Sequence, residues 1–226
     1  MPKPLREQPK IVLGLAAALI AAHAARAFLN EAQIEALFET FAIIPIRYDD
    51  AGPAPFRGPM QALAPLFGHV FLHGGWLHVG LNVLVFLQAA DLVAGRFEER
   101  EPGGLRFLAL FFGSGIGAAL AYIWLNPSSP LPAVGASGAV CGVFAAYLLS
   151  VRRDWRAAAR DPQVQRSAFW FLLVNVGLAA AARVSGVLPI AWEAHLGGFI
   201  AGAALYPTLV PKSVARPGPW DAQPPT

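Results

Sequence analysis

Six long apolar runs divide this sequence and constrain its fold more than any other feature. They cover approximately residues 11–29, 74–94, 105–125, 137–151, 168–186 and 190–210. Roughly 20 apolar residues form a helix that crosses the ~30 Å hydrocarbon core of a bilayer. Only 14% of the residues are charged, against roughly 25% in soluble domains, and the mean hydropathy is +0.50. The sequence predicts an all-α membrane protein, a six-transmembrane-helix bundle, with no substantial soluble domain.

The segments outside these runs predict the domain organisation. We expect a polar N-terminal tail (1–10), a six-span domain (11–210) and a C-terminal tail (211–226) whose five prolines indicate disorder. Residues 30–72 form a long, partly helical first loop in which Asn30 is a candidate N-cap of an amphipathic helix. The pattern fits an amphipathic helix that lies at the membrane surface and an ordinary helix in a solvated loop about equally well. Residues 1–29 also fit a cleaved signal peptide, but cleavage would leave an odd number of spans.

The basic residues predict the orientation. Six spans place 13 of the 17 Lys and Arg residues on one side of the membrane. They lie in both tails and in the connections 95–106 and 152–167. Because Lys and Arg are enriched in cytoplasmic loops, we expect both termini in the cytoplasm and a multi-pass protein of the plasma (inner) membrane. The net charge of +3 is too small to suggest nucleic acid as a partner.

This topology brings four polar residues from three spans to one depth. Each is counted from the basic residue that ends its span: Asn82 (14 from Arg96), His78 (18 from Arg96), Ser137 (15 from Arg152) and His195 (17 from Lys212). At 1.5 Å per residue, these heights are roughly 21–27 Å. Polar side chains are costly at that depth unless they face a cavity or one another. We therefore expect a polar site slightly below the outer surface.

The residue types in this layer suggest acyl-transfer chemistry. Ser137 belongs to GASG (135–138), which by itself favours a Gly/Ser-rich helix start with a packing or capping serine. With His195 as general base, Ser137 becomes a candidate nucleophile at a helix N-terminus. The Ser137 N–H, the His78 imidazole and the Asn82 amide are candidate oxyanion donors. No acidic residue lies at this depth, so the sequence predicts a Ser-His dyad.

Small residues near the site predict close helix packing; they are Gly135, Gly138, Gly142, Gly198 and Gly202. His69 and His73 form a possible metal set with His78, but no neighbouring Cys or acidic residue completes it. We expect neither metal nor cofactor, and we expect His69 and His73 to form hydrogen bonds within the loop and the head of the second span. Two polar residues of the first run, His23 and Arg26, are expected to snorkel to an interface.

Three motifs carry a family resemblance. They are FLHGGWLHVGLN (71–82), GASG (135–138) and AHLGGFIAG (194–202), on the second, fourth and sixth predicted spans. In this order and spacing the chain resembles the rhomboid intramembrane serine proteases over nearly its whole length. The resemblance implies Ser137 as nucleophile, His195 as general base, and His78 and Asn82 in the oxyanion site. It also implies cleavage of single-span membrane proteins, without a cofactor, and a first loop embedded beside the bundle.

The chain departs from many rhomboids at two places. A Trp-Arg pair in their first loop is replaced here by Ala64 and Pro65, and an aromatic residue four positions after the serine is replaced by Cys141. The contacts that fix the loop and the His195 ring are therefore open. Two alternatives remain: a catalytically silent membrane chaperone or binding protein of the same fold, and a small transporter with a polar midplane site. The natural substrate and the oligomeric state do not follow from the sequence.

Overall fold

The computed structural model describes residues 8–50, 52, 54–98, 102–185 and 190–211. Within them the structure is helical apart from one isolated β-bridge, between Ile43 and Ala133. The α-helices are α1 (Lys10–Ala25), α2 (Glu31–Phe41), α3 (Pro59–Gly68), α4 (Trp76–Glu98), α5 (Gly103–Leu125), α6 (Ser137–Ser150), α7 (Trp155–Arg160), α8 (Pro162–Ser185) and α9 (Trp192–Leu209). The predicted all-α fold is confirmed. Most residues of the two predicted tails lie outside the described residues.

Four segments are long and apolar enough to cross a membrane: Lys10–Phe28, Trp76–Glu98, Gly103–Leu125 and Pro162–Ala182. Helix α6 is apolar but has only 14 residues, and α9 has 18. At 1.5 Å per residue α6 is roughly 21 Å long, shorter than the ~30 Å hydrocarbon core. Length and composition therefore support four of the six predicted spans, and the count of six stays a prediction.

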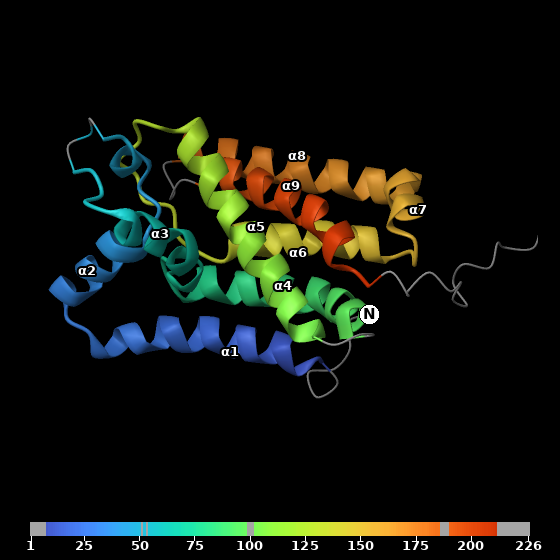
Figure 1. Ribbon diagram of the computed structural model, residues 1–226. Helices are drawn as coiled ribbons and strands as arrows, with labels where there is room; N and C mark the ends of the chain where they lie inside the picture. Colours follow the sequence, from blue (N-terminus) through green and yellow to red (C-terminus); the bar gives the residue numbers. More distant parts are fainter. Residues whose placement is uncertain (1–7, 51, 53, 99–101, 186–189, 212–226) are drawn as a thin grey trace, which may run out of the picture.

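The short helix α6 lies at the centre of the bundle. Ten of its 14 residues are buried, and it packs against α4, α5 and α9. Helix α5 runs obliquely across these helices, with α1 along one edge and α8 along the other (Figure 1). Neighbouring helices therefore cover most of the surface of α6.

Short sequence signals set several helix boundaries. The Asn30 side chain accepts a hydrogen bond from the Gln33 N–H, and the Gln33 side chain accepts one from the Asn30 N–H. This capping box starts α2 where the sequence predicted it. Helix α8 begins at Pro162, six residues before the predicted run, because Asp161 accepts from the Gln163 N–H and proline suits the first helical turn.

The first loop is attached to the segment that precedes α6. Across the β-bridge, the Ile43 N–H donates to the Ala133 carbonyl (3.0 Å) and the Ala133 N–H donates to the Ile43 carbonyl (2.8 Å). The Ile46 N–H donates to the carbonyl of Ser129 (3.1 Å). These bonds fix the loop without a Trp-Arg pair.

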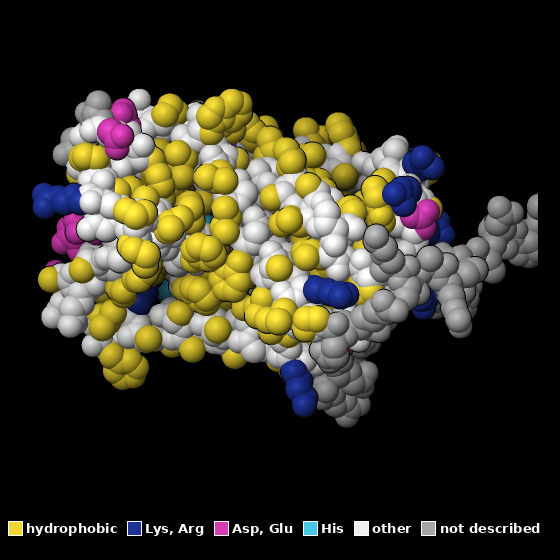
Figure 2. All heavy atoms as spheres, viewed as in Figure 1, with side chains coloured by type: hydrophobic (Ala, Val, Ile, Leu, Met, Phe, Trp, Pro, Cys, Tyr) yellow, Lys and Arg dark blue, Asp and Glu magenta, His cyan; other side chains and the backbone are white. Residues whose placement is uncertain are grey.

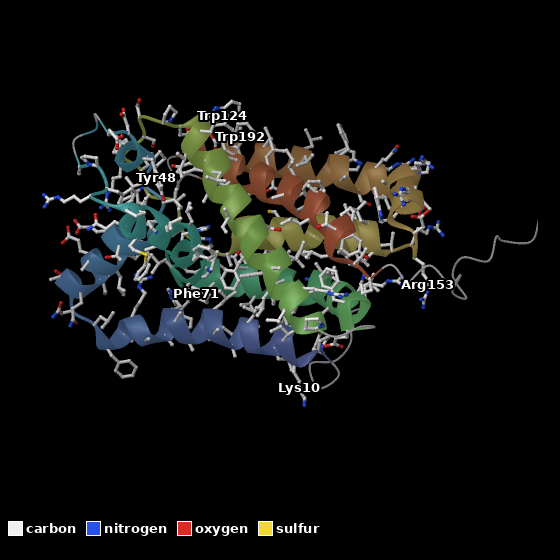
Figure 3. The ribbon with its side chains drawn as sticks, viewed as in Figure 1. Lys10, Tyr48, Phe71, Trp124, Arg153 and Trp192 are labelled. Carbon is white, nitrogen blue, oxygen red and sulfur yellow. The ribbon has the colours of Figure 1, made fainter. Side chains whose placement is uncertain are left out.

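Apolar side chains dominate the surface between the two ends of the molecule. Figure 2 shows hydrophobic side chains over the middle of the visible face and most charged side chains near its ends. Helix α8 contributes many exposed apolar side chains: Phe169, Trp170, Leu173, Val174, Val176, Leu178 and Val184. Arg153 lies at one end of the molecule, and Tyr48 lies toward the opposite end (Figure 3). This distribution is typical of a protein surrounded by lipid.

Candidate active site

Ser137 and His195 come together across the interface between α6 and α9. The His195 Nε2 atom lies 2.8 Å from the Ser137 Oγ atom. Ser137 is the first residue of α6, and His195 lies in the first turn of α9. Both side chains are partly buried. A hydroxyl within hydrogen-bond distance of an imidazole is the arrangement expected of a nucleophile and its general base.

Glycines bring the two helices to this distance. A Cβ atom on Gly198 would lie 2.0 Å from the Gly138 carbonyl oxygen, and one on Gly202 would lie 2.2 Å from the Gly142 carbonyl oxygen. A Cβ atom on Gly142 would also lie 2.1 Å from the Ser114 Oγ atom of α5. Four of the glycines that the sequence singled out thus lie at one backbone contact between α6 and α9.

The second ring nitrogen of His195 has a partner on α8. Its Nδ1 atom lies 2.7 Å from the Oδ1 atom of Asn175. The Asn175 Nδ2 group donates to the carbonyl of Phe171 (2.9 Å), one turn earlier in α8. Asn175 was not among the residues singled out from the sequence.

A depth count from Arg166, the basic residue that precedes Asn175 in the sequence, hides Asn175. It lies nine residues after Arg166 but 13 after Pro162, where α8 begins. At 1.5 Å per residue these separations are roughly 14 Å and 20 Å, and only the second approaches the predicted depth of the site. The available signal was the residue type, since a polar side chain inside an apolar run is costly without a partner.

Two further donors lie beside Gly135, two residues before Ser137. A Cβ atom on Gly135 would lie 2.8 Å from the His78 Nε2 atom and 3.6 Å from the Asn82 Nδ2 atom. The Gly74 N–H donates to the His78 Nδ1 atom (3.3 Å), so in the neutral ring Nε2 carries the proton. Asn82 is buried, and its Nδ2 group has no acceptor among the described residues. The predicted oxyanion donors therefore converge on the segment that leads to Ser137.

Gly135 has a backbone conformation that suits glycine. Its φ angle is +114°, which lies in the region of positive φ that L-residues rarely adopt. Its N–H donates to the carbonyl of His69 (2.9 Å). An L-residue at this position would be strained and would also collide with His78.

The loop histidines hold this segment in place. The His69 Nδ1 atom donates to the Pro65 carbonyl (2.8 Å), and the Ala136 N–H donates to the His73 Nε2 atom (3.3 Å). Burial lowers the pKa of both imidazoles to about 4, so both are neutral at pH 7. His69 is bonded within the first loop, as expected, whereas the partner of the His73 ring lies in the segment that precedes α6. Among the described residues no group of three or more His, Cys, Asp and Glu side chains could hold a metal ion.

The expectation that His23 snorkels to an interface is wrong, and that for Arg26 stays a prediction. His23 is buried and packs edge-to-face on Trp76, with ring centroids 4.7 Å apart. Arg26 donates from its guanidinium to the carbonyl of His73. A loop carbonyl and an aromatic ring satisfy these side chains inside the protein, and thereby join the end of α1 to the start of α4.

Cys141 is buried one turn after Ser137 and has a free thiol. Cys141 itself offers no aromatic ring. One turn further along α6, an aromatic ring belongs to a stack of three rings from three helices. Phe171 of α8 stacks on Phe144 of α6 (centroids 4.5 Å apart) and on Phe199 of α9 (5.4 Å). This aromatic cluster packs the turn of α8 that carries the Asn175 hydrogen bond.

Comparison with known proteins gives one family. Residues 60–212 match the family described as the Rhomboid domain. The chain is 28% identical over 137 residues to RHOMBOID-like protein 5 of Arabidopsis thaliana, which covers 61% of this chain and 41% of that protein. It is 31% identical over 153 residues to Rhomboid protease AarA of Providencia stuartii, covering 60% and 52%. With Rhomboid protease GluP of Bacillus subtilis the identity is 30% over 126 residues, covering 56% and 23%.

These relatives are longer than this chain. The matched region spans 41%, 14% and 25% of the lengths of three of them, from Arabidopsis thaliana, Toxoplasma gondii and Emericella nidulans. The family match covers 68% of this chain (153 of 226 residues), begins within α3 and leaves α1 and α2 outside. What is shared is therefore the part of the chain that contains Ser137, His195, His78 and Asn82.

Proposed function

Because this chain belongs to the rhomboid family, we propose that it is an intramembrane serine endopeptidase in which Ser137 is the nucleophile and His195 the general base. The family match and the apolar helices identify a multi-pass membrane protein. The observation that carries the proposed activity is the 2.8 Å separation of the Ser137 Oγ and His195 Nε2 atoms. The names of relatives such as Rhomboid protease AarA and Rhomboid protease GluP support the same reaction class.

The proposed reaction uses a peptide bond and water. The Ser137 Oγ atom attacks the scissile carbonyl carbon while its proton passes to the Nε2 atom of His195. Collapse of the tetrahedral intermediate breaks the C–N bond, and His195 returns the proton to the leaving amine. Water, activated by His195, then hydrolyses the Ser137 ester and regenerates the hydroxyl. The atoms and protons balance with these groups alone.

Three donors would stabilise the negative charge that develops on the substrate oxygen. They are the protonated Nε2 of His78, the Nδ2 group of Asn82 and the Ser137 N–H. A helix leaves its first N–H groups without intrahelical acceptors, so the backbone contribution at Ser137 is available. The buried Asn82 amide, which has no acceptor among the described residues, supports this assignment. Donors held ready before the reaction lower its barrier without reorganisation.

We infer that the protein has six spans, with both termini in the cytoplasm of a plasma (inner) membrane. The position of the basic residue Arg153 at the end of the molecule opposite Tyr48 supports that orientation (Figure 3). The site then opens close to the outer membrane surface, and the substrates are single-span membrane proteins surrounded by lipid. Nucleic acid is not an expected partner, and the oligomeric state is left open.

The test combines cleavage with covalent labelling. Purified protein in lipid is incubated with a panel of single-span substrates, beside the variants Ser137→Ala and His195→Ala. We expect both variants to lose cleavage, and a serine-directed mechanism-based inhibitor to label Ser137 in the unchanged protein alone. The matched control is Ser114→Ala, which removes a buried hydroxyl from α5 outside the site. Cleavage by purified Ser137→Ala at the unchanged rate would reject the assignment, and a silent binding protein would show binding without cleavage.

A further inference from the structure

Asn175 is a polar residue within the apolar helix α8, and its presence there needs a structural or functional reason. The helix is the least buried of the four candidate spans, with only 6% of its most apolar window buried. Its neighbours Val174 and Val176 are exposed and apolar. A polar amide in such a helix is costly unless it is hydrogen-bonded. Asn175 meets this requirement with a carbonyl of its own helix and with one nitrogen of His195.

The two hydrogen bonds fix the orientation of the amide. The Phe171 carbonyl can only accept a hydrogen bond, so the group that faces it at 2.9 Å is the Nδ2 amino group. The Oδ1 atom is then the one that lies 2.7 Å from the Nδ1 atom of His195. An amide oxygen can only accept. His195 must therefore donate, and its Nδ1 atom carries a proton.

This proton assignment decides what the opposite nitrogen can do. In a neutral imidazole only one nitrogen is protonated. With the proton on Nδ1, the Nε2 atom has a free lone pair directed at the Ser137 hydroxyl, 2.8 Å away. That is the tautomer a general base requires. The opposite tautomer would put an N–H against the hydroxyl and would leave no base.

We propose that Asn175 is a positioning residue for His195: its side-chain oxygen holds the imidazole in the Nδ1-protonated tautomer and fixes the direction of Nε2 toward Ser137. This role rests on the proposed function of the Ser137–His195 pair and deepens it. It adds a third helix, α8, to the two that carry the pair. The aromatic stack of Phe171 on Phe144 and Phe199 fixes the turn of α8 from which Asn175 reaches His195.

The residue type follows from the surroundings. In many serine enzymes a carboxylate orients the histidine, but an ionised carboxylate on the lipid-facing helix α8 would be expensive to bury. An amide accepts the same hydrogen bond without a charge. It therefore orients the ring at a smaller cost of desolvation, and gives up the electrostatic stabilisation that a carboxylate would provide to the imidazolium.

The first experiment measures the tautomer and does not depend on activity. Protein with ¹⁵N-labelled histidine is studied by NMR in lipid nanodiscs, and His195 is assigned among the five histidines by comparison with His195→Gln. We expect Nδ1 to be protonated and Nε2 unprotonated in the unchanged chain. In Asn175→Leu, which removes the acceptor but retains similar volume, the two tautomers should mix. An unchanged His195 spectrum in that variant would overturn the proposal.

The second experiment measures function in the same variants. The loss of one hydrogen bond should lower kcat and the rate of Ser137 labelling about tenfold in Asn175→Leu, with KM changed less than twofold. Asn175→Asp, in its neutral form, keeps an oxygen acceptor for Nδ1 and an O–H donor for the Phe171 carbonyl, and should retain the Nδ1-protonated tautomer and most of the labelling rate. Val174→Ala is the control for changes to α8 itself and should match the unchanged protein. Equal labelling rates in Asn175→Leu and Val174→Ala would also overturn the proposal.

The two experiments separate this proposal from the proposed function. If the protein cleaves nothing but its His195 tautomer changes in Asn175→Leu, then the Asn175 contact holds and the protease assignment fails. If cleavage depends on Ser137 and His195 but neither the tautomer nor the labelling rate responds to Asn175→Leu, then the protease assignment stands and Asn175 has no positioning role. Thermal unfolding of each variant shows whether it is folded before either result is used.

Discussion

The backbone of Gly138 touches the backbone of Gly198, so closely that a Cβ atom on Gly198 would lie 2.0 Å from the Gly138 carbonyl oxygen. Gly138 follows Ser137 directly, and Gly198 lies three residues after His195. The contact that packs α6 against α9 is thus also the contact that sets the distance between the Ser137 hydroxyl and the His195 imidazole. Stability and geometry of the candidate site depend on the same pair of glycines.

We therefore expect Gly198→Ala to destabilise the protein and to separate Ser137 from His195. Overpacking a close contact costs about 1–3 kcal/mol, and the neighbouring atom here is backbone, which cannot rotate away. Alanine regains about 1 kcal/mol of helix propensity over glycine. The balance predicts a lower unfolding temperature in detergent and a lower rate of Ser137 labelling.

Gly177→Ala is the matched control for this variant. Gly177 lies within α8, and no atom lies within 4 Å of the Cβ that alanine would add. Only the gain in helix propensity applies there, so the unfolding temperature should stay the same or rise. If Gly198→Ala and Gly177→Ala unfold at the same temperature, the backbone contact does not limit stability.

Gly135→Ala should impair the reaction more than the fold. Gly135 has φ +114°, and an added Cβ would lie 2.8 Å from the His78 Nε2 atom. The substitution would displace a candidate oxyanion donor, and the loss of one such donor costs on the order of 100–1,000-fold in kcat. Steady-state cleavage of a single-span substrate measures this effect. Gly80→Ala, on α4 with open space around the new Cβ, serves as control and should keep the unchanged kcat.

The sequence predicted the polar site because each of its residues is a polar residue in an apolar run. Each of these runs ends at a basic residue, from which the depth can be counted. Ser137, His195, His78 and Asn82 emerged from this rule, and the structure places them around the start of α6. Their roles in catalysis stay predictions. Asn30 as the cap of α2 was predicted correctly because a capping box is local.

Features that depend on contacts between distant segments escaped the sequence. Asn175 was missed because Arg166, the basic residue that precedes it in the sequence, lies inside α8 and not at its start. His23 was misplaced, and the partner of Arg26 was not foreseen, because Trp76 and the carbonyl of His73 lie about 50 residues away from them in the sequence. The sequence around Ile43 and around Ala133 shows no pattern that would predict the β-bridge between these two residues. A single sequence carries little information on such pairs.

Removing both side-chain donors should show how the oxyanion charge is shared. We expect a moderate loss of kcat for Asn82→Ala, because the His78 Nε2–H and the Ser137 N–H remain. The double variant His78→Ala and Asn82→Ala should lose more, by a further factor on the order of 100. A double variant with the kcat of the unchanged enzyme would show that these side chains do not bind the oxyanion. Labelling of Ser137 in the single variants provides a check that the nucleophile is intact.

The proposed six-span topology predicts where reporter fusions will be found. Fusions after residue 160 and after residue 212 should both report the cytoplasm, and a fusion near residue 130 should report the outer side. The physical reason is that loops rich in Lys and Arg, such as 152–167, stay in the cytoplasm during membrane insertion. A cytoplasmic signal at residue 130 would contradict the orientation, because Ser137 would then be reached from the opposite face of the membrane.

The final prediction concerns what this chain can cleave. A membrane-spanning helix hides its peptide carbonyls in its own hydrogen bonds, and lipid offers no replacement partners. Ser137 can attack only a carbonyl in locally extended chain. Glycine costs a helix about 1 kcal/mol relative to alanine, and proline about 3 kcal/mol. We expect cleavage in or just outside the outer part of a substrate span, with Gly or Pro close by on the inner side.

A substrate series tests whether unwinding limits the rate. The residue before the scissile bond is kept constant while nearby Gly and Pro are replaced by Ala or Leu, and kcat/KM is measured in lipid. Each added kcal/mol of helix stability should lower kcat/KM about fivefold if unwinding precedes attack, because 1.4 kcal/mol corresponds to tenfold. The matched control places the same substitutions at the opposite end of the span, where they leave the helix near Ser137 unchanged. Rates that stay level across both series would mean that the substrate reaches Ser137 already extended, and that recognition depends on side chains and not on helix stability.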